Sequence, residues 1–299
     1  MKITITGATG FVGVNLRNYL KGKHQIDAIS VRYKPNQNIE INANAFIHLS
    51  GKAHDLKKVS DPNEYYEANF ELTKQLFDSF LNSDTDVFIF LSSVKAVTDK
   101  VDDVLCEDFK ANPKTHYGIA KNRAEEYISS VELPIGKRVY ILRPCMIHGP
   151  ENKGNLNLLY KIVAKGIPWP LGAFENKRSF LSIENLCFVI AELLENTKVP
   201  SGIYHLADDN VLSTTELIKL LRKSIGKNNL ILNISPSLIK SMARIGDYFA
   251  FPLNSERLDK LTENYVVSNK KIIKAIGKSL PVSTDVGLQK TFESFKKNK

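Results

Sequence analysis

The feature that most constrains this 299-residue chain is a glycine-spaced turn within its first thirteen residues. Residues 3–6 form a short apolar run typical of a buried strand, and residues 11–21 have the apolar spacing of a helix. Between them stand Gly7, Gly10 and Gly13. Such glycines allow a tight turn, let backbone N–H groups approach a pyrophosphate, and let the helix pack closely on the strand. The sequence therefore predicts a dinucleotide-binding unit.

Short apolar runs and helical patterns alternate up to about residue 150. The expected strands are residues 3–6, 26–31, 45–49, 87–91 and 139–142, and the expected helices are residues 11–21, 63–82 and 116–130. Strands that recur between helices form βαβ units and hence a parallel sheet. We therefore expect an α/β fold with a Rossmann-type, doubly wound parallel sheet in a nucleotide-binding domain of residues 1–150.

The pattern changes after residue 150. Helices are expected at 155–165, 182–196, 214–225 and 236–249, with short strands near 203–206 and 265–267. Residues 151–299 are expected to form mainly a smaller, mixed α/β substrate-binding lobe, with some segments returning to the Rossmann domain. The apolar segment 231–251 is interrupted by Lys240, Arg244 and Asp247 at amphipathic spacing, which favours a packing helix over membrane attachment.

Charge and cysteine content limit the possible partners and compartment. The net charge of +9 is spread along the chain without a block of five basic residues, which argues against a nucleic-acid partner. Cys106, Cys145 and Cys187 form neither a disulfide framework nor a metal pattern and suit a reducing compartment. The amino terminus has no signal-peptide pattern, and no apolar run has the roughly 18 residues of a membrane span. We expect a cytoplasmic protein with no membrane partner.

The end of the second expected strand bears on the choice of cofactor. Dinucleotide sites usually carry an acidic residue about 20 positions after the glycine turn, where it binds the adenosine ribose. This chain has Ser30 and Arg32 at that place. A hydroxyl and a guanidinium suit a 2′-phosphate, so the sequence favours NADP over NAD. In the alternative interpretation Arg32 is solvated and stacks over adenine, and Glu40 could replace the missing acid.

Four polar side chains suggest acid–base chemistry. Tyr117 and Lys121 are four residues apart in an expected helix and therefore share one face. A nearby ammonium should lower the phenol pKa from its ordinary value near 10. Ser92 and Ser93 follow an expected strand, and the carboxyl ends of parallel strands face the ligand crevice.

In this order, the glycine turn, the strand-end serines and the Tyr117–Lys121 pair resemble the short-chain dehydrogenase/reductase superfamily, specifically its extended, sugar-nucleotide-modifying branch. The resemblance runs from residue 1 to about residue 280 and includes residues 48–51 and 142–144. It implies that Tyr117 is the acid–base catalyst, that Lys121 lowers its pKa and holds the nicotinamide ribose, and that Ser93 hydrogen-bonds the reacting oxygen.

The resemblance also implies further contacts. Besides Tyr117 and Lys121, the implied cofactor-binding residues are Gly7, Thr9, Gly10, Phe11, Val12, Gly13, Ser30, Arg32, Leu49, Ser50, Gly51, Asn69 and Pro144. The implied substrate-binding residues are Lys95, Asn155, Leu156, Arg178 and Arg257. Arg178 matches a position that holds the diphosphate of a sugar nucleotide, and Arg257 is a looser match that could equally be a surface residue.

Departures from the family pattern reduce the number of possible reactions. Sugar-nucleotide 4,6-dehydratases have an Asp-Glu pair after the catalytic hydroxyl, where this chain has Val94 and Lys95, so dehydration lacks its acid and base. The 3,5-epimerising reductases have cysteine and histidine where this chain has Lys95 and Glu151. What remains is hydride exchange at the sugar C4. The chain resembles UDP-N-acetylsugar 4-epimerases and 4-ketoreductases of surface-polysaccharide pathways, and both reactions stay open.

A function without catalysis also stays open. A protein of this fold could act as a catalytically silent NAD(P)-binding redox sensor, although a sensor has no need of the Ser93, Tyr117 and Lys121 set. His54 and His148 have no further partners at ligand spacing, so no metal is expected. Trp169 could border the sugar pocket or belong to the core. The resemblance implies a homodimer through the helix that carries Tyr117.

Overall fold

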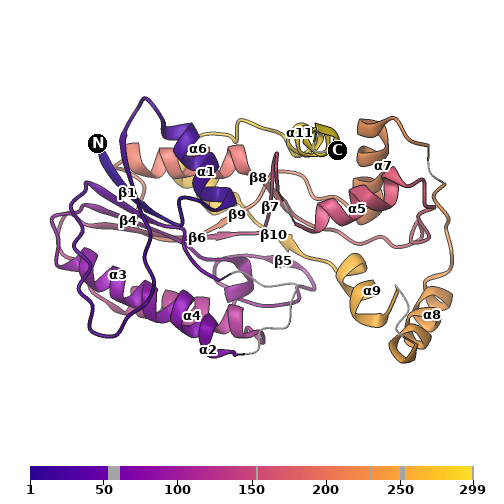
Figure 1. The fold of residues 1–299 in the computed structure, drawn as a ribbon, viewed down its shortest axis with the longest axis horizontal. Coiled ribbons are helices and arrows are strands. Elements are labelled where there is room, and N and C mark those ends of the chain that lie inside the picture. The colour runs from indigo at the N-terminus through magenta and orange to yellow at the C-terminus, as the bar shows by residue number, and fades with distance from the viewer. Residues whose placement is uncertain (53–60, 153, 229, 250–252, 298–299) are drawn as a thin grey trace.

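The computed structural model describes residues 1–52, 61–152, 154–228, 230–249 and 253–297. In this part of the chain the centre is a six-stranded sheet with the order β2-β1-β3-β4-β6-β9, in which every neighbouring pair is parallel (Figure 1). Its strands are β1 (Lys2–Thr6), β2 (Gln25–Ile29), β3 (Ala45–His48), β4 (Val87–Leu91), β6 (Arg138–Pro144) and β9 (Gly202–Leu206). This confirms the predicted Rossmann-type parallel sheet.

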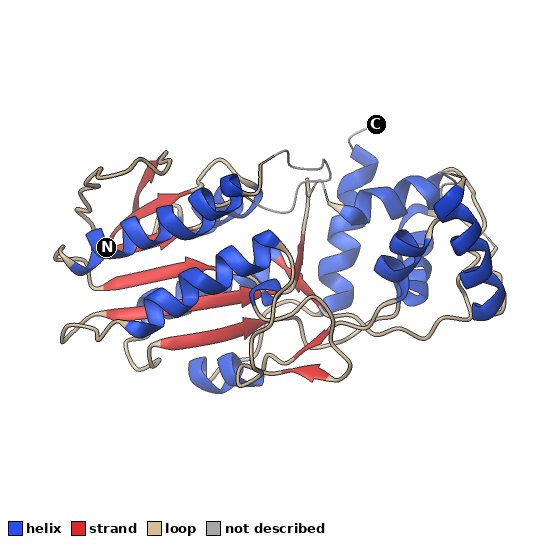
Figure 2. Cartoon of the chain, turned by 90° about the horizontal axis from the view of Figure 1, so that it is seen from below, coloured by secondary structure: helices blue, strands red, loops and turns tan. Residues whose placement is uncertain are grey.

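Helices cover both faces of the sheet. On one face lie α1 (Phe11–Leu20) and α6 (Ile183–Glu195), and on the other lie α3 (Leu72–Leu81) and α4 (His116–Ser130). Figure 2 shows helices running along the strands. Because both faces are buried, β3, β4 and the middle of β6 are apolar at nearly every position, which made them visible in the sequence.

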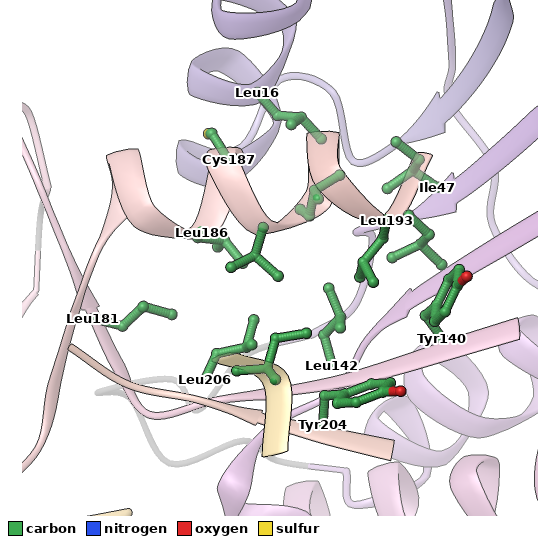
Figure 3. Packing of buried hydrophobic residues seen from close by; sticks show 14 of the residues in the cluster. Leu16, Ile47, Tyr140, Leu142, Leu181, Leu186, Cys187, Leu193, Tyr204 and Leu206 are labelled. Carbon is green, nitrogen blue, oxygen red and sulfur yellow. The ribbon is translucent and has the colours of Figure 1, made fainter. Parts of the chain in front are cut away.

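Alternate residues of each strand enter different cores. On β4, Ile89 packs in the core beneath α1 and α6, while its neighbour Phe88 packs with α3 and α4. Figure 3 shows the first of these cores, where Leu186 of α6 lies over Leu142 and Leu206 of the sheet. Because successive side chains of a strand point to opposite faces, each strand packs against the helix layers on both sides of the sheet.

The segment between β2 and β3, residues 30–44, contains neither helix nor strand, as its length predicts. It is held against the α3 face by buried Ile39 and Ile41 and by Gln75 Nε2, which donates to backbone carbonyls of this segment. β2 comes first in the strand order of the sheet and is therefore an edge strand. Its carboxyl end is open to solvent.

The second lobe has its own core. Its helices are α5 (Asn155–Ala164), α7 (Thr214–Ile225), α8 (Pro236–Tyr248), α9 (Ser255–Thr262) and α11 (Thr284–Lys297). Two short strands, β7 (Met146–His148) and β8 (Phe180–Ser182), pair in parallel. The second short pair is β5 (Val104–Leu105) with β10 (Val266–Val267), and α10 (Lys270–Ile276) follows it.

Several elements differ from those expected. Strands of two or three residues, such as β5, β7 and β8, show no detectable period, and α9, α10 and α11 were not expected from the sequence. The helix expected at 63–82 is α2 (Asn63–Tyr66), a π-helical turn η1 (Glu67–Glu71) and then α3. Such π turns occur frequently at functional sites.

Helix α8 is only partly the packing helix that was expected. It buries Ile239, Ala243 and Gly246, but Leu238 and Met242 are each more than half exposed. Among the described residues, no helix combines the length and apolar character needed to cross a membrane.

Candidate functional site

The glycine turn joins β1 to α1 at the crevice above the sheet. Gly10 N–H donates to Gly7 O at 3.0 Å, and Gly7 has a φ of 68°, which favours glycine. A Cβ on Gly13 would lie 2.3 Å from Gly7 O, and one on Gly7 would lie 2.7 Å from Ser50 N. Only glycine therefore lets α1 and the loop after β3 pack this closely on the turn.

A pocket of about 370 Å³ opens on this turn. It lies where strand order reverses between β1 and β3, which is where ligands bind in doubly wound sheets. Its lining includes Gly7, Gly10, Phe11, Val12, Gly13, Leu49, Gly51, Asn69, Ser93, Tyr117, Lys121 and Pro144, all expected from the sequence. It also includes Ser92, which was expected to face the crevice together with Ser93, and Leu91, Cys145 and Ile147, which were not expected.

Further expected cofactor residues lie outside this lining. Thr9 is exposed on the turn, and Ser50 Oγ instead donates to Thr6 Oγ1 beneath it. Ser30 and Arg32 are exposed just beyond β2. They stand at the open edge of the crevice, on the side where the adenosine end of a dinucleotide would lie.

The pocket fits a dinucleotide at a second point. Asn69 is fully buried in η1, and its Nδ2 donates to Lys52 O and Tyr65 O. Its Oδ1 accepts no hydrogen bond from the described residues, although it lies in the pocket wall. A Cβ on Gly51 would lie 2.5 Å from this oxygen and 3.2 Å from Lys121 Nζ. An acceptor and an ammonium thus converge on one spot, where they could bind a ribose hydroxyl.

Ser93 and Tyr117 meet because α4 begins close to the loop after β4. Thr115 caps α4 by accepting from Gly118 N, and a Cβ on Gly118 would lie 2.4 Å from Lys95 O. The Tyr117 hydroxyl is hydrogen-bonded to Ser93, whose Oγ accepts from Lys95 N at 3.2 Å. The structure therefore brings the two proposed catalytic oxygens together.

Lys121 lies one turn further along α4 and is buried. Its Nζ donates to Leu91 O at 2.9 Å and lies 4.5 Å from the centre of the Phe90 ring. Burial lowers the pKa of Lys121 to about 7, although the carboxylate of Glu125 acts in the opposite direction.

The expected lowering of the Tyr117 pKa is wrong for this structure. Burial raises the pKa of Tyr117 to about 12, and the hydrogen bond from Ser93 offsets only part of the rise. The Lys121 ammonium faces a carbonyl and an aromatic ring, and burial also disfavours its own charge. The sequence spacing showed that the two side chains share a face, but it could not show how completely that face is buried from solvent.

The low pKa of Lys121 predicts a pH-dependent stability. Its ordinary value is 10.5, so between about pH 7 and pH 10.5 the unfolded chain binds the extra proton and stability rises with pH. Below pH 7 the cost of burying the charge is complete. Lys121→Met should therefore be more favourable to stability, relative to wild type, below pH 7 than near pH 10. Urea unfolding at both pH values measures this, and an equal difference at both would contradict the pKa shift.

A buried ion pair that sequence analysis missed lies beneath Lys121. Glu125 accepts from Arg143 Nε at 2.9 Å and from Ser92 Oγ, and both charged residues are almost fully buried. Arg143 also contacts His205 Nε2 at 3.4 Å. The available signal was that Tyr117, Lys121 and Glu125 recur every fourth residue and so form one row on α4.

Two expected substrate residues meet at the boundary between the lobes. Lys95 Nζ donates to Asp99 O and lies 4.3 Å from the centre of the Tyr265 ring. Arg178 NH2 lies 3.6 Å from a Glu263 carboxylate oxygen. Burial lowers the pKa of Lys95, with the charges of Glu263 and Arg178 acting in opposite directions. The carboxylate of Asp99 acts on Lys95 in the same direction as Glu263, so two cations face two carboxylates in this cluster near Ser93.

The remaining expected substrate residues are more dispersed. Asn155 begins α5, and its side chain is outside what the structure describes; the Leu156 side chain is buried in the second core. Arg257 is exposed on α9. Trp169 is buried in the second core, so the core interpretation holds for that residue.

His148 and Cys145 are buried, and their surroundings are those of packing residues. His148 is fully buried between Thr291 Oγ1 at 3.0 Å and Asp208 Oδ2 at 3.4 Å, while His54 lies outside the described residues. Within the described ranges there is no group of three or more metal-ligating side chains. Burial raises the pKa of the Cys145 thiol well above its ordinary value, so the thiol beside the pocket is not an activated nucleophile.

Comparisons with known proteins agree with this architecture. The model of the NAD dependent epimerase/dehydratase family matches residues 3–207. A UDP-glucose 4-epimerase of Vibrio cholerae is 30% identical over 98% of this chain and 95% of that protein. A UDP-2-acetamido-2,6-beta-L-arabino-hexul-4-ose reductase of Pseudomonas aeruginosa is 29% identical over 52% of this chain and 38% of that protein.

A solved structure shows the same fold. The UDP-glucuronic acid 4-epimerase of Bacillus cereus, crystallised with NAD, matches with a TM-score of 0.77 at 18% identity, over 99% of each chain.

Proposed function

This chain belongs to the NAD dependent epimerase/dehydratase family, and from that premise we propose that it transfers a hydride at C4 of a UDP-linked sugar. The observation that carries the proposal is the hydrogen-bonded Ser93–Tyr117 pair, which faces the glycine turn across one pocket with Lys121 beside it. A binding module or redox sensor needs the turn but not this pair. The chain is therefore an NAD(P)-dependent sugar-nucleotide enzyme rather than a silent binding module.

Each side chain of the trio has a separate task. Ser93 Oγ hydrogen-bonds the sugar O4, and the Tyr117 hydroxyl gives or takes the proton at that oxygen. Lys121 and Asn69 would hold the ribose next to the nicotinamide, and the nicotinamide would supply or accept the hydride. The high pKa of Tyr117 keeps the phenol protonated at neutral pH, which suits proton donation to a ketone that is being reduced.

The residues after Ser93 support chemistry confined to C4. Val94 is buried, and the Lys95 ammonium is turned to Asp99 O and the Tyr265 ring. A 4,6-dehydration needs an acid and a base at these two places. Arg178, beside Lys95 at the lobe boundary, would hold the diphosphate of the sugar nucleotide.

The two C4 reactions are separated by the cofactor that the protein holds. Similarity to the Vibrio cholerae enzyme over nearly the whole chain favours a 4-epimerase. Exposed Ser30 and Arg32 at the end of β2 favour NADPH and hence a 4-ketoreductase. The nucleotide released from freshly purified, denatured protein distinguishes them. Near-stoichiometric NAD indicates the epimerase, while an empty protein that binds NADPH more tightly than NADH indicates the reductase. Turnover of neither 4-hydroxy nor 4-keto UDP-sugars would refute the proposal.

Arg32 gives a specific test of the cofactor assignment. Arg32→Ala should weaken NADPH binding by roughly 10- to 100-fold, because a charge-assisted contact to the 2′-phosphate contributes about 1.5–3 kcal/mol. NADH binding should stay nearly unchanged. Fluorescence titration measures both dissociation constants, with Lys34→Ala, an exposed cation two residues away, as the control. Equal loss for both nucleotides would contradict 2′-phosphate recognition.

The wider setting is part of the same proposal. We place the reaction in surface-polysaccharide biosynthesis in the cytoplasm, with no nucleic-acid partner. The homodimer expected through α4 stays a prediction, which light scattering tests.

A further inference from the structure

Tyr265 stands directly before β10, which lies between the sheet and the helices of the second lobe (Figure 1). Its side chain is 5% exposed and reaches the segment that follows Ser93. The hydroxyl donates to Thr98 O at 2.7 Å, with a longer contact of 3.2 Å to Val94 O. Burial raises the pKa of Tyr265, so the hydroxyl keeps its proton and acts as a donor at neutral pH. One buried hydroxyl therefore holds both ends of the segment 94–98.

The segment 94–98 fixes the positions of the two proposed catalytic oxygens. Ser93 Oγ accepts from Lys95 N at 3.2 Å, and Ser93 O accepts from Ala96 N at 2.9 Å. A Cβ on Gly118, the residue after Tyr117, would lie 2.4 Å from Lys95 O. The segment is therefore packed directly on the first turn of α4. A displacement of this segment would change where Ser93 lies relative to Tyr117.

The main chain of Tyr265 is bonded to the residues on either side of Arg178. Tyr265 N donates to Lys177 O at 2.8 Å, and Ser179 N donates to Tyr265 O at 2.9 Å. Between these two bonds, Arg178 forms a parallel bridge with Tyr265. The Arg178 guanidinium lies 3.6 Å from a carboxylate oxygen of Glu263, two residues before Tyr265. The arginine proposed to hold the diphosphate and the tyrosine that contacts the Ser93 segment thus belong to one hydrogen-bonded unit.

The hydroxyl can be separated from the other contacts of Tyr265. Lys95 Nζ lies 4.3 Å from the centre of the Tyr265 ring and donates to Asp99 O at 2.9 Å. A phenylalanine would keep this contact between cation and ring. It would also keep the backbone bonds to Lys177 and Ser179. The only bonds lost would be those from the hydroxyl to segment 94–98.

We propose that Tyr265 is a positioning residue that couples the diphosphate site at Arg178 to Ser93. The inference rests on the proposed function, in which Arg178 holds the diphosphate of the sugar nucleotide. A bound diphosphate restrains residues 177–179 and with them the main chain of Tyr265. The hydroxyl at the other end of the same residue then restrains segment 94–98. Because Ser93 and Tyr117 act on a single sugar oxygen, a small displacement of Ser93 is enough to reduce turnover.

Tyr265→Phe should lower kcat by roughly 10- to 100-fold, because the reacting groups are less precisely placed. The dissociation constants of UDP and of the cofactor should stay nearly unchanged, since Arg178 and the pocket residues remain. Steady-state kinetics and calorimetric titration measure this split. Tyr204→Phe is the matched control, because Tyr204 is 1% exposed and its hydroxyl donates to Pro200 O at 2.7 Å, outside the pocket lining. Equal losses of kcat in the two variants would contradict a positioning role.

Hydrogen exchange with UDP as the probe tests the coupling without turnover. In the wild type and in Tyr204→Phe, saturating UDP should slow exchange of the amides of residues 96–98, which donate within the segment. In Tyr265→Phe, UDP should bind without slowing them. Equal slowing in wild type and Tyr265→Phe, or no slowing in the wild type with UDP bound, would overturn the coupling and leave the proposed function standing. A wild-type protein that binds no UDP would refute the UDP-sugar assignment and this inference with it.

Discussion

Tyr117→Phe is expected to reduce turnover by about 10²- to 10⁴-fold, the usual contribution of a positioned acid–base group. The substitution removes only the hydroxyl that is hydrogen-bonded to Ser93. The glycine turn, Asn69 and Lys121 remain, so cofactor affinity should be nearly unchanged. Steady-state kinetics together with a cofactor titration would show this split between kcat and Kd.

A control for this variant lies on the same helix. Tyr127 Oη donates to Asp78 Oδ1 on the outer side of α4, away from the pocket lining. Tyr127→Phe removes the same atom and should leave turnover within a factor of a few. If Tyr117→Phe retained wild-type turnover, the assigned mechanism would be refuted and the redox-sensor function would regain support.

Breaking the Glu125–Arg143 pair should have the largest effect on stability. Arg143→Met leaves the Glu125 carboxylate almost fully buried, with the Ser92 hydroxyl still donating to it. Removing one partner of a buried ion pair costs about 3–5 kcal/mol. Urea denaturation should show that loss in the free energy of unfolding.

Two control measurements test whether burial of the ion pair causes the loss of stability in Arg143→Met. The double variant Glu125→Leu, Arg143→Met removes both charges and should recover most of the loss, because no buried charge is left unpaired. The exposed pair Lys290–Glu184 has side chains 46% and 39% exposed, and Glu184→Gln should cost less than about 1 kcal/mol. Equal effects at the two pairs would show that burial does not govern the Arg143 variant.

Some of the site was predictable because local geometry carries it. Glycine at 7 and 13 is required where the helix packs this tightly on the strand end, and the clash of a Cβ on Gly13 with Gly7 O shows why. A four-residue spacing places Tyr117 and Lys121 on one helix face in any fold. Parallel strands end at one edge of a sheet, which brought Ser93 to the same crevice.

The rest of the site needed contacts between distant segments. Glu125 and Arg143 are 18 residues apart on α4 and β6, and no local sequence pattern predicts that they form a pair. The raised pKa of Tyr117 depends on burial by several elements together. Strands of three residues, such as β7 and β8, exist only because they pair with each other.

The sequence by itself determined the parallel sheet, the glycine turn and the pairing of Tyr117 with Lys121 on one helix face, because each follows from spacings of a few residues along a strand or helix. Only the tertiary structure decided which charged side chains are buried and that Lys95 and Arg178 lie near Glu263. It also decided which side of α8 is left exposed. Hydrophobic periodicity shows that a helix has an apolar side. Whether another segment covers that side depends on packing between residues far apart in the chain.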